Sequence, residues 1–152
     1  MEKLMNVAKS LDTMYLKQYG DHMDEMKMHK LMYFSQRESL MLTGELLFEG
    51  DFYGWKFGPV LKEVRNEYKK AKPFAKYEDS VLEETRELLR GVMDRYGSLS
   101  SWKLSSLSHK EFSWLKARNG LKSGENGNVK MLVEAMKVDA LKELAARKAA
   151  LE

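Results

Sequence analysis

The sequence predicts a mainly α-helical fold: a single compact domain of five to seven helices with a short Gly/aromatic-rich extended or β-hairpin-like insert at about 44–58. Three observations support this prediction. Proline occurs twice in 152 residues whereas methionine occurs 11 times, so helix breakers are rare and helix-forming side chains are common. Apolar residues recur at helical spacing through most of the chain. Glycine and aromatic residues are concentrated in the one insert, where helix is disfavoured.

Length and composition exclude several protein classes. A chain of 152 residues is close to the commonest size of one domain, so we expect one domain over 1–152 with a core at about 4–140. With 43% apolar and 32% charged residues, the chain is neither disordered nor membrane-spanning. It has no cysteine, which excludes disulfides and thiolate metal sites and favours a cytoplasmic location. No signal peptide is evident.

The first two helices are predicted from apolar spacing and from their ends. The first ends before Gly20, which suits a left-handed C-cap. The second begins after Asp21 or Asp24, either of which can cap it, and runs to about Thr43. Its apolar residues cover most of its circumference: Met26, Met28, Leu31, Met32, Tyr33, Phe34, Leu40, Met41 and Leu42. A helix apolar on most sides is normally surrounded by others, so we expect it to be the centre of the fold.

The segment after the second helix differs in kind. Its glycines and aromatic side chains predict extended chain that covers the core. Pro59 is predicted in the first turn of a third helix, Val60 to about Ala71, because the missing proline N–H has no partner there in any case.

Four further elements complete the predicted fold. A fourth helix is capped by Asp79 or Ser80 and ends at Gly97. A short helix, opened by Ser98 or Ser100 and ending at about His109, leads to a turn around Trp114. Residues 119–128 form an exposed loop, and the last helix begins near Asn128 and frays from Ala145 onward.

The sequence contains none of the common catalytic motifs that we looked for. The chain has no phosphate-binding loop, no HExxH pair, no nucleophile elbow and no EF-hand loop. A metal set of His29, His109 and Glu38 can be drawn, but its spacing matches no ligand pattern. Ser108 and His109 are adjacent and so point apart on a helix; we interpret Ser108 as the cap of the following turn and His109 as a hydrogen-bonding partner of nearby backbone. We therefore predict no enzymatic activity, no metal and no cofactor.

A basic stretch at 62–76 has six basic and two acidic residues, with aromatic residues among them. Such a helix could follow a phosphate backbone. We interpret it instead as a solvated face, with Glu67 and Lys70 as a favourable pair, because no nucleic-acid-reading module accompanies it. Nucleic-acid binding is kept as an alternative that we do not favour.

Several segments, taken in order, resemble one known family. Residues 30–36 (KLMYFSQ) are similar to the family segment KLLYFAQ, and residues 43–48 are similar to TGxxLF. Residues 55–60 (WKFGPV) match the most specific element of the family, W-[KR]-[YF]-G-P-V. Further along the chain, residues 96–104 are similar to YGxLSxxxL and residues 104–109 to LSxLTH. The chain thus resembles the Panacea domain, the SocA-like antitoxin family, over roughly residues 4–140.

The sequence departs from the family pattern at a few positions. Arg37-Glu38-Ser39 replaces what is often a small residue followed by an aromatic one, and Glu38 puts a carboxylate on the central helix. Ser108 stands where threonine is usual, and Ser113 where proline often precedes the tryptophan.

The resemblance implies a function by binding. We expect a non-enzymatic antitoxin that neutralises a cognate protein toxin, encoded by the adjacent gene of a prophage or mobile element. An alternative is an adaptor that delivers the toxin to an AAA+ protease, and another is a nucleic-acid-binding regulator that uses 62–76. Many relatives fuse the domain to a DNA-binding module, for which we expect no room here. We expect no membrane association and leave homo-oligomerisation open.

The family motifs also give candidate residues. The partner-binding candidates are Gln36, Tyr53, Trp55, Lys56, Phe57, His109 and Trp114. The motif residues with an expected structural part are Lys30, Tyr33, Gly58, Pro59, Val60, Trp102 and Leu107. For the large aromatic residues, the sequence does not separate core packing from interface contact.

Overall fold

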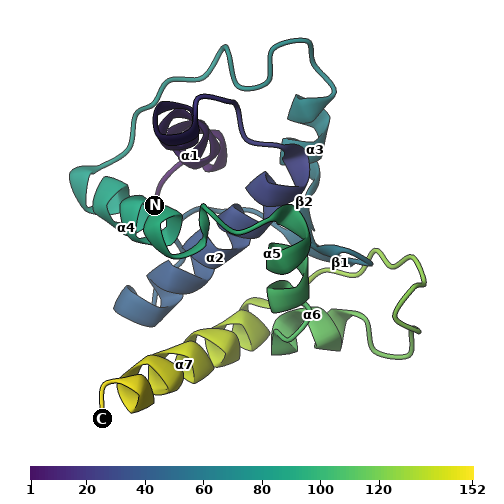
Figure 1. Ribbon diagram of the computed structural model, residues 1–152. Coiled ribbons are helices and arrows are strands. Elements are labelled where there is room, and N and C mark those ends of the chain that lie inside the picture. The colour runs from purple at the N-terminus through teal and green to yellow at the C-terminus, as the bar shows by residue number, and fades with distance from the viewer.

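Seven helices and one antiparallel hairpin form the computed structural model, which describes residues 1–152 (Figure 1). The elements are α1 (Leu4–Tyr19), α2 (Glu25–Thr43), β1 (Phe52–Trp55), β2 (Gly58–Leu61), α3 (Lys62–Tyr68), α4 (Glu83–Tyr96), α5 (Ser101–Ser108), α6 (Phe112–Ala117) and α7 (Val133–Ala150). The predicted mainly α-helical fold with a hairpin-like insert is confirmed. None of the helices combines the length and apolar composition that crossing a membrane would require.

Helix α2 is the centre of the fold, as predicted. It packs against α1, α3, α4, α5, α7 and β2. In Figure 1, α1 and α4 lie on one side of α2, and α6 and α7 lie on the other. Thirteen of its 19 residues are buried, so nearly every side of the helix contacts a neighbour.

Local signals set several helix ends. The Asp24 carboxylate accepts a hydrogen bond from the Lys27 N–H at 2.9 Å and so caps α2. Gly20 and Gly44 adopt left-handed conformations directly after α1 and α2. Ser100 caps α5 through the Lys103 N–H at 3.1 Å. The caps predicted at Gly20, Asp24 and Ser100 are confirmed.

The prediction for Pro59 was wrong. Pro59 lies in β2 opposite Gly54, and α3 begins only at Lys62. All four residues of β2 are buried, since the strand packs against α2. Proline is tolerated because β2 is an edge strand. No further strand pairs with its outer side, so the missing proline N–H breaks no ladder of hydrogen bonds there.

The start of α4 also differs from the prediction. The helix begins at Glu83, and its N-cap residue makes no side-chain capping bond. Asp79 accepts a hydrogen bond from Ser10 and pairs with Arg86, whose Nη1 lies 3.1 Å from Oδ1. Its carboxylate therefore joins α1 to α4 instead of capping a helix.

Helix α7 begins at Val133, later than predicted, because the chain before it is extended along β1. The Gly54 N–H donates to the Val129 carbonyl at 2.9 Å, and the Met131 N–H donates to the Phe52 carbonyl at 2.8 Å. These bonds satisfy the outer edge of β1, which would otherwise leave backbone groups without partners. The tail that we expected to fray is helical as far as Ala150.

Candidate functional site

A cleft of about 570 Å³ opens beside the hairpin, between the first turns of α2, α3 and the loop that returns to β1. Its lining residues are Glu25, Met26, His29, Lys30, Trp55, Lys56, Phe57, Val60, Arg65, Asn126, Gly127 and Asn128. Three predicted partner-binding residues, Trp55, Lys56 and Phe57, thus lie in one place. The volume is within the range of sites that bind small ligands.

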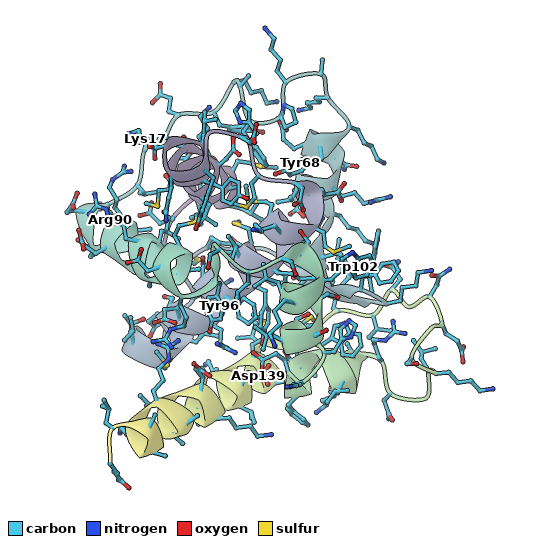
Figure 2. The ribbon with its side chains drawn as sticks, viewed as in Figure 1. Lys17, Tyr68, Arg90, Tyr96, Trp102 and Asp139 are labelled. Atoms are coloured by element: carbon cyan, nitrogen blue, oxygen red, sulfur yellow. The ribbon has the colours of Figure 1, made fainter.

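An exposed aromatic pair lies at one edge of this cleft. Phe57, at the hairpin turn, is 44% exposed, and Trp102 on α5 is 63% exposed. Their rings meet edge to face, with centroids 5.5 Å apart and planes at 90°. Trp102 lies on the side of α5 that faces the hairpin (Figure 2). Adjacent exposed aromatic residues of this kind are typical of interaction surfaces.

The hairpin turn is fixed by hydrogen bonds from three other segments. Trp114 Nε1 donates to the Trp55 carbonyl at 2.8 Å, and Ser105 Oγ donates to the Phe57 carbonyl at 2.6 Å. Trp55 Nε1 in turn donates to Asn128 Oδ1 at 3.1 Å. The hairpin turn that carries Phe57 is therefore held in place before any partner arrives, which lowers the entropic cost of binding.

Lys30 lies at the floor of the cleft and is almost completely buried, with 1% of its surface exposed. Its Nζ makes one hydrogen bond, to the Pro59 carbonyl at 3.3 Å. Burial lowers the pKa of Lys30 from its ordinary 10.5 to about 7, and the carboxylates of Glu25 and Asp24 oppose this shift only in part. The fold thus places an amine that titrates near neutral pH beside the hairpin.

His29, one turn before the middle of α2, is held in a defined tautomer by its two neighbours. Its Nδ1 accepts the Leu61 N–H at 3.2 Å, so Nε2 bears the proton and donates to Glu25 at 2.9 Å. Burial lowers the pKa of His29, and the histidine hydrogen bond lowers the pKa of Glu25. Arg65 Nη1 lies 3.1 Å from the same carboxylate. Both nitrogens of His29 are therefore occupied.

The metal set drawn from the sequence is not assembled. Glu38 forms a bidentate pair with Arg147, at 2.8 Å for each oxygen, and His29 is engaged as described. No group of three or more histidine, aspartate or glutamate side chains is positioned to hold a metal ion.

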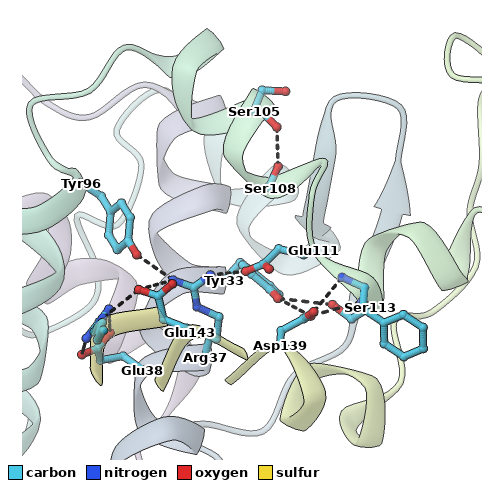
Figure 3. A network of polar contacts seen from close by, with 12 residues as sticks. Tyr33, Arg37, Glu38, Tyr96, Ser105, Ser108, Glu111, Ser113, Asp139 and Glu143 are labelled. Carbon is cyan, nitrogen blue, oxygen red and sulfur yellow. Dashed lines mark hydrogen bonds and ion pairs between the residues drawn. The ribbon is translucent and has the colours of Figure 1, made fainter. Parts of the chain in front are cut away.

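His109 stacks on Trp114, with ring centroids 4.2 Å apart and planes at 10°. Its Nε2 lies 3.4 Å from Ser105 Oγ, one helical turn away. Ser108 Oγ donates to the Ser105 carbonyl within α5 at 2.8 Å (Figure 3). The expectation that Ser108 caps the next turn was wrong, because a residue of α7 supplies that cap.

That residue is Asp139, part of a buried polar network between α2, α6 and α7 (Figure 3). Its carboxylate accepts from the Phe112 and Ser113 N–H groups at 2.7 and 3.2 Å and from Tyr33 Oη at 2.7 Å. Because Asp139 stands 106 residues after Tyr33, no local pattern in the sequence could reveal this cap. The network fixes α6, and with it Trp114 beneath the hairpin.

A second part of the network centres on Arg37. The guanidinium pairs with Glu111 and donates to Tyr96 Oη at 2.6 Å, and Glu143 of α7 lies 3.7 Å from it. Arg37, which departs from the family pattern beside Glu38, thus has partners on α4 and α7 and at the residue just before α6.

The remaining candidates are dispersed. Gln36 is buried away from the cleft, where Oε1 accepts the Leu47 N–H and Nε2 donates to the Phe48 carbonyl, each at 2.8 Å. Its amide is occupied by the loop before β1, so as folded it offers nothing to a partner. Trp114 is 5% exposed. Tyr53 is half-buried, with Lys62 Nζ 3.9 Å from its ring centroid.

Much of the charge in the 62–76 stretch has partners within the chain. Glu67 is buried, pairs with Lys70 at 2.8 Å as predicted, and accepts the Phe74 N–H at 2.8 Å. Arg65 pairs with Glu25 and lies over the Trp55 ring, 5.2 Å from its centroid. Arg65 is the residue of this stretch that lines the cleft.

A family model described as "Antitoxin SocA-like, Panacea domain" matches residues 28–115. The matched region runs from α2 to α6 and contains the hairpin, the exposed aromatic pair and Lys30. Neither a curated protein nor a solved structure matches the chain.

Proposed function

The chain belongs to the SocA-like Panacea family of antitoxins, and from this membership we propose that it is a non-enzymatic antitoxin that binds and masks a cognate protein toxin. The toxin is the product of the adjacent gene in a prophage or mobile element. Masking a toxin requires a binding surface but no catalytic group, which agrees with the lack of common catalytic motifs in the sequence.

The observation that supports this proposal best is the exposed pair of Phe57 and Trp102. Aromatic residues contribute a large share of binding energy when they are buried by a partner. Phe57 is 44% exposed on the hairpin turn, where Ser105 Oγ bonds its carbonyl, and Trp102 is 63% exposed on α5. We propose that the toxin covers them.

The test is co-expression of the neighbouring gene product with this chain. Expressed alone, that product should arrest growth, and the wild-type chain should restore it. The double variant Phe57→Ala/Trp102→Ala should fail to restore growth and should bind the toxin at least about 30-fold more weakly, equivalent to about 2 kcal/mol. Its melting temperature should stay within a few degrees of wild type, because both side chains are largely exposed.

Leu141→Ala is the matched control, since Leu141 is 68% exposed but lies on α7. It should restore growth like wild type. A neighbouring product that is harmless, or a double variant that rescues fully, would contradict the proposal. Rescue that disappears when the host AAA+ protease is deleted would instead support the adaptor alternative, because simple masking needs no protease.

A further inference from the structure

The cleft beside the hairpin has features of a small-molecule site that toxin masking does not need. We propose that it binds a small organic carboxylate, with the carboxylate at the Lys30 ammonium and an apolar body against Trp55, Phe57 and Val60. This inference does not depend on the identity of the toxin, because it concerns the free protein.

The walls of the cleft fit the apolar part of such a ligand. Met26, Trp55, Phe57 and Val60 supply its hydrophobic surface, and its volume of about 570 Å³ accommodates a molecule of modest size. Hydrogen bonds already hold Trp55 and Phe57 at both main-chain carbonyls. The walls of the site are therefore preformed, and only the buried Lys30 side chain has to turn toward the ligand.

The floor of the cleft fits a single negative charge. The Lys30 ammonium has three donors but makes only one hydrogen bond, at 3.3 Å, and it is removed from water. A carboxylate would supply the missing acceptors and an opposite charge. Lys56 adds a second cation to the lining, whereas Arg65 is already paired with Glu25. Because the Glu25 carboxylate also lines the cleft, a dianion such as a phosphate ester is disfavoured.

The protonation of Lys30 makes the proposal measurable. The charged groups near it are Asp24 and Glu25 at the start of α2 and Lys56 and Arg65 from the hairpin and α3. The imidazoles of His29 and His109, from α2 and α5, complete its surroundings, and burial lowers the pKa of each, which favours their neutral forms. With the pKa of Lys30 at about 7, the cationic form that binds a carboxylate is lost as the pH rises above neutral.

The experiment is a titration of the isotope-labelled full chain with 3-phenylpropanoate, followed by NMR at pH 6.5 and 8.5. The neutral 3-phenylpropanamide is the matched ligand control. We expect the acid to bind at least tenfold more tightly than the amide at pH 6.5, and about 25-fold more weakly at pH 8.5 than at pH 6.5, following the protonated fraction of Lys30. The Gly58 amide and the Trp55 indole should shift on binding.

Variants give a second readout. Lys30→Met should weaken binding of the acid at least tenfold and remove its pH dependence, while Lys62→Met, which removes a cation over Tyr53 outside the cleft, should leave binding unchanged. Equal binding of acid and amide, or no dependence on pH, would overturn the proposal with wild-type protein alone, however the variant folds.

A third titration distinguishes a small-molecule carboxylate from the carboxylate of an acidic side chain. If the blocked dipeptide acetyl-Glu-Phe-amide binds and the free acids do not, the cleft receives an acidic side chain of a protein partner, and the small-molecule assignment is wrong. If this chain did not restore growth when co-expressed with the neighbouring gene product, the results of these titrations would be unaffected. The two proposals can therefore fail independently.

Discussion

Gly58 determines how closely the hairpin approaches α2. Its φ of 118° lies in a region that side chains rarely adopt, and a Cβ built there would stand 2.6 Å from Lys30 Cε and 2.6 Å from Ser108 Oγ. Any larger residue would therefore be strained and would also collide with the floor of the cleft. This explains the glycine of the WKFGPV motif by backbone geometry and by contact with Lys30.

Gly58→Ala should lower the free energy of unfolding by about 2–4 kcal/mol, since backbone strain and steric overlap add. Chemical denaturation monitored by circular dichroism measures this loss. Gly20→Ala is the matched control, because Gly20 also has positive φ, at 83°, but nothing within 4 Å of the added Cβ. It should cost only about 1–2 kcal/mol. Equal losses of unfolding free energy in the two variants would mean that Lys30 does not pack tightly against Gly58.

At the scale of elements, Asp139 joins three of them. Its carboxylate is 1% exposed and accepts two N–H groups at the start of α6 and the Tyr33 hydroxyl of α2. Burial raises the pKa of Tyr33 well above its ordinary value, so the hydroxyl remains a donor. One side chain of α7 therefore fixes α6 against the central helix.

Asp139→Ala should destabilise the fold by about 3–5 kcal/mol, because three donors, of which the Tyr33 hydroxyl and the Ser113 N–H are buried, lose the acceptor they share. Tyr33→Phe removes only one of these bonds and should cost about 1–2 kcal/mol. Urea denaturation of both single variants and the double variant gives their coupling energy. Glu134→Ala, at an exposed position of α7, is the control and should change stability by less than about 0.5 kcal/mol. Additive losses would contradict a shared network.

The difference between local and long-range contacts explains which elements the sequence could predict. Asp24, Ser100 and the glycines after α1 and α2 act within a few residues, so their caps could be identified from the sequence. The cap of α6 comes from α7 and the extended run at 129–131 is fixed by β1, so both depend on contacts between distant segments. Pro59 was misplaced for the same reason: pairing with β1 and burial on α2 outweigh its preference for a first helical turn.

The candidate site could be predicted only in part. The motif WKFGPV located the hairpin, and four of its residues, Trp55, Lys56, Phe57 and Val60, line the cleft. The burial of Lys30 could not be predicted, because lysine is normally exposed and its cover comes from the hairpin, which is distant in sequence. Trp102 was expected to be structural, yet it is the more exposed member of the aromatic pair.

At the scale of the whole molecule, the region that the family model matches is smaller than the packed unit. Residues 28–115 exclude α1 and α7, although both pack on α2. Val7, Ala8 and Leu11 of α1 are fully buried, and Met136 and Ala140 of α7 are each 2% exposed. Without these two helices, α2 would expose apolar surface on both of the sides that they cover.

We therefore expect a fragment of residues 28–115 not to unfold cooperatively, because the apolar area it can bury is too small to offset the conformational entropy of ordering the chain. Thermal melting by circular dichroism and binding of a hydrophobic dye test this. A fragment of residues 1–144 lacks only the exposed end of α7 and should melt cooperatively, somewhat below the full chain since it loses the Arg147–Glu38 pair. A cooperative transition of 28–115 at a similar temperature would show instead that α1 and α7 are not needed for the matched region to fold.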